Sequence, residues 1–78
     1  MTKQPRKRRT DSLQKVLEIM GDNMRKLREA KKLTGLDMGT MLQINPQSYS
    51  GYERGDSAMS LELLGQICSL LECKYEDI

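Results

Sequence analysis

Apolar residues recur at helical spacing along most of the chain and predict a series of short helices. The first series comprises Leu13, Val16, Leu17, Met20, Met24 and Leu27. Gly21 interrupts this series, so the pattern predicts either one bent helix over 12–32 or two helices, over 12–20 and 22–32. Residues 1–10 carry no periodic apolar positions and are expected to form a disordered arm.

Two short helices are expected in the middle of the chain. Thr34 is suited to cap the first, whose apolar positions are Leu36, Met38, Met41 and Leu42. Residues 43–45 are read as a tight turn. Asn45-Pro46 pairs a capping residue with proline at the first helical position, which predicts a helix from Pro46 to Glu53. Two helices joined by so short a turn match a helix-turn-helix, whose second helix lies in the DNA major groove.

The last part of the chain predicts one longer helix, opened by Ser60 after a chain reversal at Gly55. Its core face is expected to comprise Leu61, Leu64, Ile67, Cys68 and Leu71. A short turn is expected over 74–78. Because no stretch shows sustained strand alternation, the expected fold is all-α, with four or five short helices.

The small formal net charge of +2 hides an asymmetry along the chain. The first ten residues hold no acid and five basic side chains: Lys3, Arg6, Lys7, Arg8 and Arg9. Residues 11–78 hold eight basic and eleven acidic side chains, which gives this part a charge of −3. A basic arm on an acidic body is typical of a nucleic-acid or anionic-surface contact, although a solvated, solubilising terminus has the same composition.

Composition excludes several other classes of protein. Histidine is absent, and with it the commonest general base and metal ligand, so neither a catalytic constellation nor a metal or cofactor site is expected. Two cysteines are too few for a disulfide scaffold or a zinc site; Cys68 is expected to be a small buried residue and Cys73 to be incidental. With no secretory signal and no apolar run of membrane-spanning length, a reducing, cytoplasmic setting is expected.

Several short motifs resemble the Cro and lambda-repressor-type helix-turn-helix domains of bacteria and phages. They are Met20–Arg28, the ungapped stretch Gly39–Gly55 with its ending Tyr52-Glu53-Arg54-Gly55, and Tyr75–Ile78. The resemblance implies a compact, four- to five-helix, lambda-repressor-like domain over 21–78. Residues 11–20 would then be an N-terminal helical extension, and the protein would be cytoplasmic and associated with the nucleoid.

The resemblance also implies which side chains read DNA. Gln47 and Ser48 fall on the first turn of the recognition helix, where the family points side chains into the major groove. Glutamine can read adenine with two hydrogen bonds, and serine can contact either kind of base edge. Ser50 is a further candidate for a base or a phosphate, and Pro46 can offer only apolar contact, to a thymine methyl group. Without the motif, these would be ordinary polar residues on a solvent face.

Charged and aromatic residues around that helix have expected structural roles. Arg28 and Glu53 match an arginine and a glutamate that form a salt bridge between the first and the recognition helix in the family; otherwise they are two separate surface charges. Tyr49 and Tyr52 lie three residues apart and are expected in the core, rather than as platforms for stacking bases.

Phosphate contacts would supply most of the DNA affinity. The acidic body offers few donors near the motif, and the candidates are Asn45, Arg54, Lys31 and Lys32. This scarcity favours a role in DNA binding for the arm residues Arg6, Lys7, Arg8 and Arg9.

One such domain contacts half of a palindromic operator, so a homodimer on duplex DNA is expected. No small-molecule effector domain is expected, and a dimer would have to use this domain's own surface. The candidate interface residues are Leu63 and Leu70 on the last helix and Leu13, Val16, Leu17 and Ile19 in the extension. The alternative is that these residues extend the core.

The favoured function is a sequence-specific DNA-binding transcriptional regulator, expected to be a repressor, and not an enzyme. Two departures from the family pattern, together with the net acidic body, keep a second class open. Gly35 replaces a glutamine that holds a phosphate in relatives, and Gly51 replaces a base-reading side chain. Gln43 also departs from the pattern, since it replaces the turn glycine. The alternative is a protein-interaction module, antitoxin-like or an anti-repressor, with weak or lost DNA reading.

Overall fold

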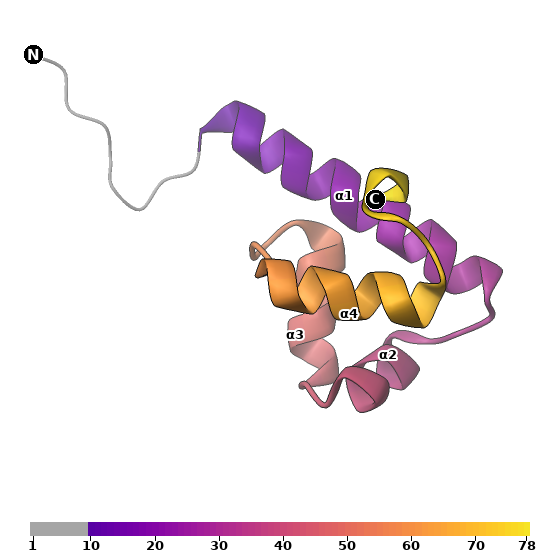
Figure 1. Cartoon of the computed structure of the whole chain (residues 1–78). Coiled ribbons are helices and arrows are strands. Elements are labelled where there is room, and N and C mark those ends of the chain that lie inside the picture. Colours follow the sequence, from indigo (N-terminus) through magenta and orange to yellow (C-terminus); the bar gives the residue numbers. More distant parts are fainter. Residues whose placement is uncertain (1–9) are drawn as a thin grey trace, which may run out of the picture.

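A computed structural model describes residues 10–78, which form four α-helices and a final 3₁₀ turn (Figure 1). These elements are α1 (Asp11–Ala30), α2 (Gly35–Leu42), α3 (Pro46–Arg54), α4 (Leu61–Leu71) and η1 (Tyr75–Asp77). No strand occurs among these residues, so the all-α fold class is confirmed. The basic arm was expected over residues 1–10; residues 1–9 lie outside the part of the chain that the structure describes, and Thr10 caps the first helix.

The first helix is continuous, and the two-helix alternative is wrong. α1 begins after Thr10, whose hydroxyl accepts a hydrogen bond from the Leu13 amide at 3.1 Å, and it passes through Gly21 without a break. A glycine inside a helix costs about 1 kcal/mol relative to alanine, which tertiary contacts can offset. Here Gly21 is buried against α3, and the extension over 11–20 is the first half of α1.

The three helix starts predicted from capping signals are confirmed. The Asn45 side-chain oxygen accepts from the Gln47 amide at 2.8 Å, and the Ser60 hydroxyl accepts from the amide three residues later at 3.1 Å. Thr34 forms a reciprocal capping box: its hydroxyl accepts from the Asp37 amide at 3.0 Å, and the Asp37 carboxylate accepts from the Thr34 amide at 2.8 Å. The amide and hydroxyl of Thr34 hold the pKa of Asp37 below its usual value.

All four α-helices end in the same backbone motif. Each is followed by one residue in the left-handed conformation: Lys32, Gln43, Gly55 or Glu72. The amide after that residue donates back to the carbonyl five residues earlier, over 2.9 to 3.2 Å, which defines a Schellman motif. Only one of the four left-handed positions holds glycine, so three side chains bear a steric cost that glycine would avoid.

Gln43→Gly is therefore expected to stabilise the protein by about 1 kcal/mol, because Gln43 has a φ of 59° with its Cβ in an unfavourable position. The free energy of unfolding in urea measures the effect. The matched control is Gln66→Gly, in the interior of α4, which is expected to destabilise by about 1 kcal/mol. A loss of stability in both variants would contradict the account of the turn.

The core lies between the four α-helices, each of which contributes side chains to one buried cluster. Its largest fully buried side chains are Tyr49, Met24, Met38 and Ile67, and Leu42 and Leu71 complete the cluster. Three residues predicted on apolar faces are instead exposed: Leu61 at 81%, Leu36 at 64% and Met41 at 44%. Leu61 and Leu36 occupy the first turns of their helices, where no neighbouring helix covers them.

Candidate nucleic-acid interface

The first turn of α3 presents polar side chains to solvent. Gln47 and Ser48 are exposed, whereas Pro46 and Ser50 are half-buried. Asn45, which precedes the helix, is also exposed, but its side-chain oxygen is occupied by the cap on the Gln47 amide. Its amide nitrogen makes no hydrogen bond within residues 10–78 and can still donate to a ligand.

α2 lies very close to the start of α3, and Gly39 allows the approach. A Cβ added to Gly39 would lie 2.9 Å from the Pro46 Cα, which is closer than real side chains come. At the other end of α2, a Cβ on Gly35 would meet the Ser50 hydroxyl at 3.8 Å. Ser50 therefore faces the beginning of α2, which leaves Gln47 and Ser48 as the outward pair on this turn.

α1 holds the other end of α3 through three residues spaced seven apart, which lie on one face of the helix. The Gln14 amide donates to the Gly55 carbonyl at 3.0 Å. At Gly21 the helices touch through their backbones, since an added Cβ would lie 2.2 Å from the Glu53 carbonyl oxygen. Arg28 pairs with the Glu53 side chain. Neither the contact of Gln14 nor the packing role of Gly21 was predicted, although the seven-residue spacing of these two residues and Arg28 is visible in the sequence.

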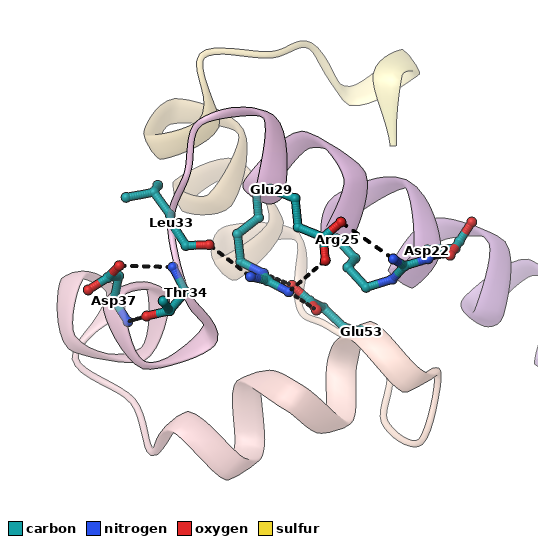
Figure 2. Close-up of polar contacts among 8 residues, drawn as sticks. Asp22, Arg25, Glu29, Leu33, Thr34, Asp37 and Glu53 are labelled. Atoms are coloured by element: carbon teal, nitrogen blue, oxygen red, sulfur yellow. Dashed lines mark hydrogen bonds and ion pairs between the residues drawn. The ribbon is translucent and has the colours of Figure 1, made fainter.

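The Arg28–Glu53 ion pair expected from the resemblance is present. The Arg28 Nε and Nη2 atoms donate to the two carboxylate oxygens at 2.7 and 3.1 Å, and Nη1 donates to the Leu33 carbonyl at 2.8 Å (Figure 2). Only 14% of the Arg28 side chain and 10% of the Glu53 side chain are exposed. The hydrogen bond to Glu53 raises the pKa of Arg28. The three hydrogen bonds of the Arg28 guanidinium therefore connect α1 to α3 and to the loop before α2.

Tyr49 lies in the core, as expected, and Tyr52 packs half-buried against it. The Tyr49 side chain is fully buried, and its hydroxyl makes no hydrogen bond within the described chain. Burial, and next the nearby Glu53 carboxylate, raise the pKa of this phenol. Both aromatic rings are therefore structural. The exposed amide and hydroxyl groups of α3 belong to Gln47 and Ser48, at the start of the helix.

A helix-turn-helix family model matches residues 24–78, which is most of the chain. The matched region contains α2, the turn, α3 and α4 in the order and geometry described above. The chain belongs to the Cro and lambda-repressor-type helix-turn-helix family. This is a family of DNA-binding regulators, and the expected recognition helix of this helix-turn-helix protein is α3.

The cations predicted to contact phosphate lie in different settings in this helix-turn-helix protein. Lys31 is paired with the Glu72 carboxylate, and the Arg54 Nε pairs with Asp56 at 2.9 Å, although both pairs are exposed. Lys32 is exposed and carries no ion pair within residues 10–78. Because Arg54 ends α3, it lies about 12 Å along the helix from Pro46 and away from the outward pair.

The helix-turn-helix core leaves the candidate dimer residues in two environments. In the extension, Leu13, Val16 and Ile19 are about half exposed, whereas Leu17 is buried and is not available to a partner. Its side chain packs within the core of the single chain. The pair on α4, Leu63 and Leu70, is half-buried and packs against the core cluster, as the alternative held.

One curated relative is similar to this helix-turn-helix protein: Antitoxin PezA of Streptococcus pneumoniae serotype 4 (strain ATCC BAA-334 / TIGR4), 37% identical over 60 residues. The match covers 77% of this chain and 38% of the relative, so this chain spans about two fifths of its length. No solved structure matched. Within residues 10–78, no helix has the length and hydropathy of a membrane span, and no group of three or more potential metal ligands occurs.

Proposed function

We propose that this protein is a sequence-specific transcriptional regulator, a repressor, that reads the major groove of duplex DNA with α3. One observation carries the proposal: α3 is held at its far end by α1 and flanked by α2, while Gln47 and Ser48 face solvent on its first turn. A recognition helix contacts base edges with its N-terminal residues, and a rigid seat fixes where those side chains lie.

In this proposal the side chains at the start of α3 have separate roles. Gln47 reads an adenine through paired hydrogen bonds, and Ser48 contacts a neighbouring base edge. Pro46 packs against a thymine methyl group. Ser50, which faces α2, is a lesser contributor. A bidentate contact discriminates against the wrong base by about 1–3 kcal/mol, so Gln47 is the main source of specificity.

Phosphate contacts position the protein on the duplex. Lys32 and the Asn45 amide nitrogen are the donors that carry no ion pair or hydrogen bond in the described chain. Lys31 and Arg54 would exchange their carboxylate partners for phosphate. The arm residues Arg6, Lys7, Arg8 and Arg9 supply further charge, which the acidic residues 11–78 do not provide.

The proposed assembly is a homodimer on a palindromic operator, bound at the nucleoid in the cytoplasm. Dimer symmetry then sets the spacing of the two half-sites, which is one helical turn of DNA or a multiple of it. The exposed face of Leu13, Val16 and Ile19 is the candidate contact between subunits.

Selection of bound duplexes from a random-sequence pool, read by gel shift at low salt, tests this function. Enrichment of a palindrome with adenine in each half-site is the expected result. Retention of unrelated sequences at equal affinity would show that α3 does not discriminate between bases, and this result would contradict the proposal.

A second function is favoured by the relative's name. Antitoxin PezA is an antitoxin by name, and in this second function the present protein would neutralise a partner protein while binding DNA weakly. Gly35 and Gly51, where relatives place DNA-contacting side chains, and the acidic first turn of α2 at Asp37 are consistent with weak binding. In the selection experiment, no retained DNA at low salt is the outcome that favours this function.

A further inference from the structure

The C-terminal end of α4 brings two cysteines together. Glu72 is left-handed, with a φ of 54°, and the Cys73 amide donates to the Cys68 carbonyl at 3.0 Å. The Glu72 amide donates to the Ser69 carbonyl at 3.3 Å. These two bonds complete a Schellman motif, in which the side chains at the two positions held by Cys68 and Cys73 frequently contact one another.

Among the helix ends of residues 10–78, only α4 has thiols at both positions. The equivalent pairs are Arg28 and Leu33, Gly39 and Ile44, and Gly51 and Asp56. Both α4 thiols are free, with Cys68 buried at 6% exposure and Cys73 half-buried against the core. Burial, and next the neighbouring Cys68 thiol, raise the pKa of Cys73, which agrees with two sulfur atoms in proximity.

Small molecules can reach this pair. An open hollow is lined by the two cysteines together with Gly65, Ser69, Glu72 and Tyr75. The Tyr75 hydroxyl lies over Gly65, where an added Cβ would meet it at 3.0 Å, and η1 packs against α4. The thiols therefore lie between a helix end and the C-terminal segment, and they face a solvent-accessible hollow.

We propose that Cys68 and Cys73 form a reversible oxidation site, a dithiol that the fold holds ready to close into an intrachain disulfide. The oxidant is a low-molecular-weight disulfide such as oxidised glutathione. The Cys73 thiolate attacks it, forming a mixed disulfide and releasing one glutathione thiolate; the Cys68 thiolate then attacks the Cys73 sulfur and releases the second. Two electrons pass to the small disulfide, and the two protons lost by the cysteines end on the two glutathione thiols.

The disulfide joins α4 to the C-terminal segment without involving α3. That segment returns to α1, where the Asn23 amide donates to the Ile78 carbonyl at 3.3 Å (Figure 1). Oxidation is expected to raise the melting temperature by about 5 °C or more, because it removes conformational freedom from the unfolded chain. The inference does not depend on the proposed function, since neither cysteine lies on α3.

Equilibration of the full chain with reduced and oxidised glutathione tests the site. Intact mass and alkylation of the remaining thiols measure how much disulfide forms, and this gives the effective concentration of one thiol toward the other. The measurement is made in buffer and in 8 M urea (roughly the range that unfolds small domains). We expect the loss of two hydrogens, reversal by dithiothreitol, and an effective concentration at least about tenfold higher in the folded chain. A matched Cys73→Ala variant has one cysteine and cannot lose two hydrogens within the chain. It should keep either the free Cys68 thiol or a glutathione adduct on it.

Equal effective concentrations in buffer and urea would overturn the proposal, because sequence proximity alone would then explain the disulfide. Stable glutathione adducts on the folded wild-type chain, or disulfides only between chains, would overturn it as well. A disulfide that forms in the folded chain but lowers the melting temperature would contradict the claim that the oxidised form fits the native helix end.

Discussion

Gly21→Ala is expected to destabilise the protein by about 3 kcal/mol, because the added methyl group meets backbone rather than a movable side chain. The Cβ would lie 2.2 Å from the Glu53 carbonyl oxygen and 2.7 Å from that of Tyr52. Both carbonyls belong to the last turn of α3, so α1 and α3 must separate to admit it. A domain of this size has a net stability of about 4–12 kcal/mol, and the loss is a large part of that.

Gly51→Ala is the matched control for this prediction, measured by the same urea unfolding. It is also a glycine inside a helix, but a Cβ there would lie 3.8 and 3.9 Å from the Arg54 and Asp56 side chains, which is ordinary contact. The alanine is expected to stabilise α3 by up to about 1 kcal/mol. If the two variants changed stability in the same direction, the close crossing of α1 and α3 at Gly21 would be refuted.

The second large effect is expected at the Arg28–Glu53 pair. Arg28→Met and Glu53→Gln should each cost about 3–5 kcal/mol, because either change leaves a mostly buried charge without its partner. Arg28→Met also removes the donor to the Leu33 carbonyl. Thermal and urea unfolding of each single variant measure these losses.

A double-mutant cycle separates the pairing from the two side chains' other contacts. The double variant Arg28→Met with Glu53→Gln should lose less than the two single variants added together, by about 2–3 kcal/mol. The control cycle uses Arg54 and Asp56, which form an exposed pair at 2.9 Å and should couple by less than about 1 kcal/mol. If the two losses in the free energy of unfolding were additive, the Arg28–Glu53 ion pair would not be what holds α3 in place.

The helix starts could be predicted from sequence because the chemistry is local. Thr34, Asn45 and Ser60 each cap a helix with a side chain that lies two or three residues from its partner amide. The left-handed ends at Lys32 and Glu72 could not be predicted in this way, because neither residue prefers that conformation. Their conformation follows from where the next helix or turn must begin.

The candidate site was predictable where the family motif covers it and not where it depends on packing. The ion pair of Arg28 and Glu53 was expected because the motif contains both residues. Gly21 was interpreted as a helix interruption, since only the crossing with α3 explains why a Cβ is excluded there. Likewise, periodicity placed Leu61 on the core face, although the end of a helix has no neighbour to cover it.

Base discrimination by Gln47 is the most direct test of the account. On the selected operator, affinities of the wild-type chain and of Gln47→Ala are measured for every single base-pair substitution, with Gln66→Ala on α4 as the matched control. We predict that Gln47→Ala loses about 1–3 kcal/mol of discrimination at one base pair in each half-site and none elsewhere, while the control is unchanged. An unchanged specificity profile in Gln47→Ala would contradict the claim that the start of α3 reads DNA.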